Sequence, residues 1–225
     1  VVLSSNDPYY YRFLVDQLLE NPEVHLRNLP ANVSKGEPLM VVTLWLISVF
    51  IGGTKEAAGY VLAWYPVVSA VATAIIVYII GFVVTDDKRV GLASVLTLAI
   101  VPVHAFRTSL GFADHHAFDY PWIALTILAL CVIATNCRKR EPRSLQVKRG
   151  IAAIILGLSI VGQTLSWDNS PILLIPLGLY LIFESLRAAF QDRSPTPVVL
   201  HVLIGIGGGT TILWLLHIQY SWHTT

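Results

Sequence analysis

Charged residues make up only 13% of this 225-residue sequence, about half of the roughly 25% that is usual in soluble domains. That scarcity excludes an ordinary soluble enzyme and a disordered tail. The formal net charge of +1 gives no long-range field that would gather phosphates, which excludes a nucleic-acid binder. Two cysteines without a CxxC pair exclude a disulfide framework and structural zinc. Because 55% of the residues are hydrophobic, the composition predicts an integral membrane protein.

Long runs without Asp, Glu, Lys or Arg are the candidates for crossing a bilayer, which takes about 17–25 mostly apolar residues. They are 38–54, 57–85, 90–106, 120–137, 150–167, 169–183 and 194–225. The strongly apolar part of the first run is too short to span, which favours a re-entrant or surface-lying helix. We therefore predict an all-α, polytopic helical membrane protein. Residues 1–56 would form a first external loop with amphipathic and re-entrant helices, and residues 57–225 a transmembrane helical domain of about six spans.

The orientation follows from Lys and Arg in the short loops, because such residues favour the cytoplasmic side. The segment 138–149 (RKREPRSLQVKR) is strongly basic and contains a single acid, Glu141. It is predicted to face the cytoplasm, which places 107–119 and 168–170 outside and 85–89 and 187–197 inside.

The first 37 residues are polar and punctuated by prolines. Apolar residues at helical spacing predict a short amphipathic helix within 9–20. No signal peptide is visible, and the chain does not begin with methionine, so we expect a fragment of a longer protein. The three tyrosines at 9–11 are predicted to be interfacial belt residues.

Two acidic motifs lie at membrane boundaries on the predicted external side. In the segment 111–119 (GFADHHAFD) two carboxylates flank two imidazoles. In an extended loop the side chains at i and i+2 share a face, so Asp114 and His116 can bind one cation while His115 points elsewhere. A carboxylate–imidazole pair suits Mn²⁺ or a similar divalent ion, and zinc stays an alternative. Asp7 is the candidate third ligand if 38–54 does not cross the membrane, although its tripeptide also suits a turn or a helix N-cap.

The motifs SSNDPYYYR (4–12) and RTSLGFADHHAFD (107–119) together resemble the catalytic subunit of oligosaccharyltransferase, in particular the archaeal AglB type. In that family an Asp-Pro-aromatic-aromatic motif in the first external loop supplies one metal-binding Asp, and the second motif supplies two more ligands. The resemblance implies that Asp7, Asp114 and His116 are metal ligands and that Asp7 and Asp114 are catalytic. It also implies a C-type membrane glycosyltransferase fold, of which this chain holds the N-terminal transmembrane part.

The implied reaction is transfer of an oligosaccharide from a dolichyl (polyprenyl) phosphate carrier to Asn in Asn-x-Ser/Thr, which is protein N-glycosylation. A divalent cation, Mn²⁺ or Mg²⁺, would neutralise the carrier phosphate, and Arg107 is a candidate contact to that phosphate. The implied partners are a lipid-linked oligosaccharide, an acceptor polypeptide and the lipid bilayer, with the active site on the external face of the cell membrane. The family's further catalytic Glu and its sequon-binding domain have no counterpart in these residues. We therefore expect the 225 residues alone to transfer nothing.

Two alternatives use the same residues differently. One is another polyprenyl-phosphate-sugar-dependent membrane glycosyltransferase. The other is a non-enzymatic transporter with a metal site in its mouth, which the scarcity of ionisable residues within the spans disfavours. The glycine-rich segment 205–209 resembles a phosphate loop, but it lies within an apolar run and is predicted to serve close helix packing.

Overall fold

The computed structural model describes residues 3, 6–23, 26, 38–134, 143–166, 174–191 and 194–220. Within these ranges the regular structure is helical throughout, which confirms the predicted all-α fold. The main helices are α1 (Asn6–Glu20), α3 (Pro38–Ile51), α4 (Lys55–Thr85), α5 (Lys88–Ala99), α6 (Pro102–Arg107), α7 (His115–Ala134), α8 (Arg143–Thr164), α9 (Leu174–Phe190) and α10 (Thr196–Tyr220).

Helices α4, α7, α8 and α10 are long and apolar enough to cross a membrane. The predicted run 90–106 is divided between α5, which has 12 residues, and the short α6. The division falls where Pro102 lacks a backbone N–H and begins a new helix. Helix α9 has 17 residues and lies at the lower limit for a span. The count of about six spans, and with it the division at residue 56, stays a prediction.

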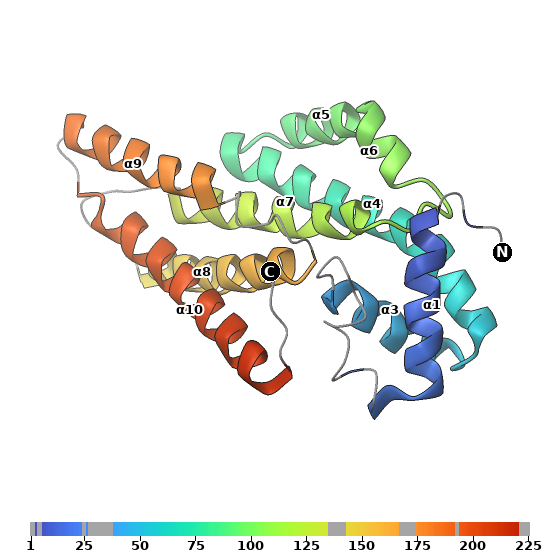
Figure 1. Ribbon diagram of the computed structural model, residues 1–225. Helices are drawn as coiled ribbons and strands as arrows, with labels where there is room; N and C mark the ends of the chain where they lie inside the picture. Colours follow the sequence, from blue (N-terminus) through green and yellow to red (C-terminus); the bar gives the residue numbers. More distant parts are fainter. Residues whose placement is uncertain are drawn as a thin grey trace.

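The long helices run alternately up and down the bundle (Figure 1). Helices α7 and α9 end on the left of the view, where α8 and α10 begin, and the connection from α4 to α5 lies nearer the middle. The start of α7 and the end of α8 lie at the opposite end, where α1 and α3 also lie. The described parts of two segments predicted to be external, 1–56 and 107–119, therefore lie at one end of the molecule. Residues 135–142, which include the most basic part of the 138–149 segment, and 167–173 fall outside the described ranges.

Helix α3 has 14 residues, which corresponds to a length of about 21 Å and is less than the roughly 30 Å of a bilayer's hydrocarbon core. It packs against α1 and the first half of α4, in a core that includes Leu14, Leu18, Leu44 and Leu62. Gly52–Gly53, both with positive φ, separate α3 from α4. The short α3 agrees with the expectation that residues 38–54 do not cross, and it leaves α1 at the same end as the start of α7.

Glycines allow α8 and α10 to approach closely. A Cβ on Gly157 of α8 would lie 2.8 Å from the Gly205 carbonyl oxygen, and one on Gly209 would lie 2.8 Å from the Gly157 carbonyl oxygen. Gly205 and Gly209 lie four residues apart on one face of α10, an arrangement that favours helix contact in membranes. Gly207 and Gly208 face open space. The prediction of close helix packing in this segment is therefore confirmed for Gly205 and Gly209.

Candidate functional site

The candidate site lies where the loop 108–114 leads into α7. Gly111 has φ +81°, a left-handed conformation that glycine adopts without strain, and its N–H donates to the Ala63 carbonyl of α4 at 2.9 Å. Asp114 directly precedes the helix, and its carbonyl accepts the N–H of Ala117 at 3.1 Å. At the end of the bundle near α1, the end of the loop and the first turn of α7 therefore present Asp114, His115 and His116.

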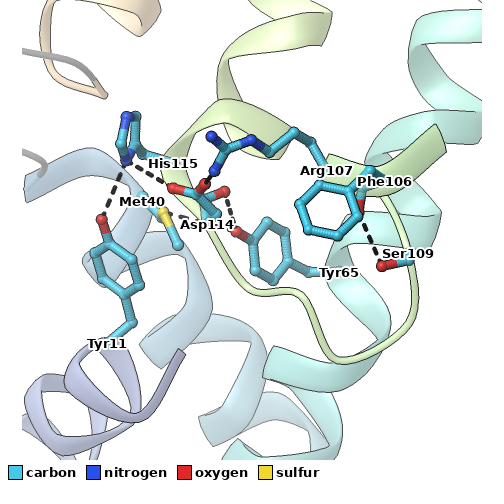
Figure 2. Close-up of polar contacts among 8 residues, drawn as sticks. All are labelled: Tyr11, Met40, Tyr65, Phe106, Arg107, Ser109, Asp114 and His115. Atoms are coloured by element: carbon cyan, nitrogen blue, oxygen red, sulfur yellow. Dashed lines mark hydrogen bonds and ion pairs between the residues drawn. The ribbon is translucent and has the colours of Figure 1, made fainter. Parts of the chain in front are cut away.

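The Asp114 carboxylate is the centre of an ion cluster (Figure 2). Its side chain is 2% exposed, and one oxygen pairs with the Arg107 guanidinium. The other oxygen lies 2.8 Å from Nδ1 of His115. Burial by itself raises the pKa of this carboxyl, but the His115 hydrogen bond and the nearby basic side chains outweigh burial and lower the pKa to about 2. The carboxylate is therefore ionised at neutral pH.

Both histidines belong to the cluster. Ligand atoms of Asp114, His115 and His116 all lie within 4.8 Å of one another, and the two imidazole centroids are 4.1 Å apart. The expectation that His115 points away is wrong. It assumed an extended loop, in which alternate side chains share a face, whereas residues from 115 onward are helical and successive side chains turn by only about 100°.

Asp7 lies in the first turn of α1 and is half-buried. It is not part of the 4.8 Å group, but it lies close enough for its charge to act on the His116 imidazole. Asp7 is therefore near the cluster, and its predicted role as a third metal ligand stays a prediction.

Tyr11 connects α1 to the cluster, with its hydroxyl 3.4 Å from Nδ1 of His115 (Figure 2). Its side chain is completely buried, so the prediction of an interfacial belt residue is wrong for Tyr11. It inserts between α1 and the start of α7, whereas Tyr9 is 50% exposed. The run of identical residues concealed this difference, because helical periodicity turns neighbouring side chains to different faces.

Arg107, the predicted phosphate contact, ends α6 and pairs with Asp114. Its side chain is 33% exposed, and its guanidinium lies 5.5 Å from the Phe112 ring centroid. The arginine is therefore held over the loop by an ion pair and a cation–π contact, with part of its surface open to a further anion.

Helix α4 supports the start of α7 through two hydrogen bonds that the sequence analysis missed. The Tyr65 hydroxyl donates to the Asp114 carbonyl, and the Ser69 hydroxyl donates to the Ala117 carbonyl. No local signal marks either residue, since 48 or 49 positions separate the partners. The one unusual residue in this part of the predicted span is Pro66, which lies next to Tyr65 within the continuous helix α4.

One carboxylate and two imidazoles form a donor set that suits a borderline divalent cation such as Mn²⁺ or Zn²⁺. The low pKa of Asp114 and the mutual proximity of the three side chains fit such an ion. Among the described residues this is the group of His, Cys, Asp and Glu side chains that has the geometry for a metal. A cation there would lie beside Arg107, so the site can attract an anionic group from two directions.

Comparison with known proteins places the chain in context. The family model for the N-terminal part of the oligosaccharyl transferase STT3 matches residues 1–222. The chain is 26% identical over 218 residues to dolichyl-phosphooligosaccharide-protein glycotransferase 3 of Archaeoglobus fulgidus, and the aligned region covers 92% of this chain and 25% of that protein. It is 24% identical over 183 residues to glycotransferase 2 of the same organism, covering 79% of this chain and 28% of that protein.

Two solved structures share the fold. The archaeal oligosaccharyltransferase AglB from A. fulgidus, in complex with an inhibitory peptide and a dolichol-phosphate, matches with a TM-score of 0.71 and 24% identity over 95% of this chain and 26% of that one. The A. fulgidus oligosaccharyltransferase in complex with Zn and sulfate matches with a TM-score of 0.74 and 22% identity over 99% and 29%. The predicted partial membrane glycosyltransferase fold is confirmed. The chain spans about a quarter of the length of the relatives it matches.

Proposed function

The chain belongs to the family of the N-terminal part of the oligosaccharyl transferase STT3, and on that premise we propose that it contributes the metal-binding half of an oligosaccharyltransferase active site. The reaction is transfer of an oligosaccharide from a dolichyl phosphate carrier to Asn in the Asn-x-Ser/Thr motif of a polypeptide. The observation that carries the proposal is the group of Asp114, His115 and His116 beside Arg107, at one end of a bundle of apolar helices.

Asp114 and His116 would hold a divalent cation, Mn²⁺ or Mg²⁺, with Asp7 as the third ligand from α1. The bound cation would supply Lewis-acid stabilisation of the carrier phosphate as the glycosidic bond breaks. The relative that was solved with Zn supports a metal site in proteins of this fold. His115 already contacts Asp114 and Tyr11, so its role is to orient the carboxylate and to join α1 to α7.

The chain's own side chains divide the remaining work. Arg107, with a third of its side chain exposed, contacts the carrier phosphate while its ion pair with Asp114 loosens. Asp7 accepts a hydrogen bond from the side-chain amide of the acceptor Asn, which weakens the conjugation that makes amide nitrogen a poor nucleophile. The relative bound to a peptide and a dolichol-phosphate supports both substrate classes.

The protein is a multi-pass membrane protein, and we infer that the cluster lies on the external face. The inference rests on the basic 138–149 segment. Its described part, residues 143–149, begins α8 at the end of the bundle opposite to the cluster. On this reading residues 1–56 form the first external loop, and residues 57–225 form the transmembrane domain.

Cysteine labelling tests this orientation. With Cys131 and Cys137 replaced by serine, Tyr9→Cys and Ser109→Cys are expected to react with a membrane-impermeant maleimide added outside, and Lys88→Cys only after the membrane is opened. All three introduced positions are exposed, so accessibility in the folded protein does not limit the reaction. Labelling of Tyr9→Cys and Ser109→Cys from opposite sides would mean that α3 crosses, and the proposed pairing of Asp7 with the cluster would be lost.

A transfer assay tests the function itself. The complete gene product in lipid nanodiscs receives a dolichyl-phosphate-linked oligosaccharide and a fluorescent Asn-x-Thr peptide. We expect a glycopeptide in the presence of Mn²⁺, none after EDTA treatment, and recovery when Mn²⁺ is restored, because the cation balances charge on the carrier phosphate. A peptide with glutamine in place of the asparagine is the control. Equal transfer with and without EDTA contradicts the metal's role, and no transfer with Mn²⁺ contradicts the proposed reaction.

A further inference from the structure

Two hydroxyl groups one turn apart on α4 bind the backbone of the ion cluster. Tyr65 donates to the carbonyl of Asp114, and Ser69 donates to the carbonyl of Ala117, one turn into α7. Both residues are buried, with Tyr65 8% exposed. The Tyr65 ring also packs edge-on against Phe118, with the ring centroids 6.5 Å apart. The start of α7 is therefore held to α4 by side chains that contact its backbone and not the ligand atoms of the cluster.

A third contact fixes the loop before the cluster. The carbonyl of Ala63 accepts the N–H of Gly111 at 2.9 Å. Residues 111, 114 and 117 are thereby attached to one short stretch of α4, residues 63–69.

We propose that Tyr65 is a positioning residue that orients the Asp114 carboxylate for cation binding, with Ser69 as its helper. This inference rests on the proposed function. The Tyr65 hydroxyl and the Ala117 N–H both donate to the Asp114 carbonyl oxygen. The carboxylate of the same residue lies against Arg107 and His115 (Figure 2). Without the Tyr65 hydroxyl, the carbonyl loses one of these two partners and the carboxylate gains freedom to rotate away. Groups that support a metal ligand in this way are commonly worth about 10–100-fold in metal affinity or activity.

The test compares Tyr65→Phe with Tyr60→Phe in the complete gene product. Both changes remove one hydroxyl from a tyrosine of α4, but Tyr60 is 50% exposed and lies away from the cluster's backbone contacts. The dissociation constant for Mn²⁺ is measured by electron paramagnetic resonance titration, well below the unfolding temperature. We expect Tyr65→Phe to bind Mn²⁺ about tenfold more weakly and Tyr60→Phe to match the wild type. In the transfer assay, Tyr65→Phe is expected to need more Mn²⁺ for half-maximal rate and to approach the wild-type rate when Mn²⁺ saturates.

Each outcome bears on the inference. Wild-type Mn²⁺ affinity in Tyr65→Phe overturns it while leaving the proposed function intact, and a lower unfolding temperature with unchanged Mn²⁺ affinity shows a purely structural role. If Tyr65→Phe does not fold, Ser69→Ala carries the same test, with Ser94→Ala as its control because the Ser94 hydroxyl bonds only within α5. Unchanged Mn²⁺ affinity in Ser69→Ala then overturns the inference. A wild-type protein that binds no Mn²⁺ refutes the metal site itself.

Discussion

Replacement of Asp114 by asparagine is expected to lower glycan transfer by at least about a hundredfold and to abolish Mn²⁺ binding. Even groups that only support a metal ligand cost about 10–100-fold when they are removed, and Asp114 is the sole carboxylate within the 4.8 Å group. The asparagine side chain has nearly the same shape but carries no charge, so Arg107 and His115 lose the anion that they share. The rate of glycopeptide formation and the Mn²⁺ titration measure the two effects.

Asp86→Asn is the matched control for this change. Asp86 is exposed after the end of α4 and has φ +57°, a conformation that asparagine tolerates well. The Asp86→Asn change should leave the rate of glycan transfer and the Mn²⁺ affinity unchanged.

Asp7→Asn and His116→Ala are expected to lower glycan transfer and Mn²⁺ affinity in the same way as Asp114→Asn if the three residues share one cation. Transfer at the wild-type rate by Asp114→Asn would remove the cluster from the mechanism.

Gly157→Ala is expected to destabilise the bundle by about 1–3 kcal/mol, because the added methyl group meets the Gly205 carbonyl oxygen at 2.8 Å and helix backbones cannot easily move apart. For a chain of this size, that loss corresponds to a fall of roughly 2–12 °C in the midpoint of thermal unfolding. Helices α8 and α10 make the most extensive helix–helix contact described, so a local separation has a large effect. Circular dichroism of the purified protein during heating measures the change.

Gly207→Ala, in the neighbouring helix α10, supplies the opposite expectation. A Cβ at Gly207 meets nothing within 4 Å, and alanine favours the helix more than glycine does. The midpoint should therefore stay the same or rise slightly. Equal falls for the two variants would mean that the close contact between α8 and α10 at Gly157 does not cause the loss of stability.

The sequence was informative about the bundle because apolar length is a property of one segment at a time. Charge-free runs located α4, α7, α8 and α10 within a few residues. The start of α7 was placed too late, since the run was counted from residue 120, although the helix begins at His115 and takes in Asp119. Asp119 was predicted to be a loop residue, but it belongs to α7 and its exposed fraction is only 3%.

The site was predictable only in part. The residue types at 114–116 predicted a cation site. The direction of the His115 side chain could not be predicted, because it depends on whether residue 115 belongs to the loop or to the helix. The roles of Tyr65 and Ser69 depend on contacts across nearly fifty residues, and nothing in the local pattern distinguishes these two hydroxyls from others in the spans. Tyr11 was misread for the same reason, because its burial is decided by packing against α7.

The contact between Tyr11 and His115 sets an order of events during biosynthesis. The two residues are 104 positions apart, so at 5–20 residues per second the partner of Tyr11 leaves the ribosome roughly 5–20 s later. In that interval α1 can already pack on α3 and α4, which are made first and share its core. The start of α7 then arrives at a prepared surface. A nascent chain stalled before residue 114 would carry the Tyr11 half of the contact alone, and the contact with His115 forms only after the start of α7 has been made.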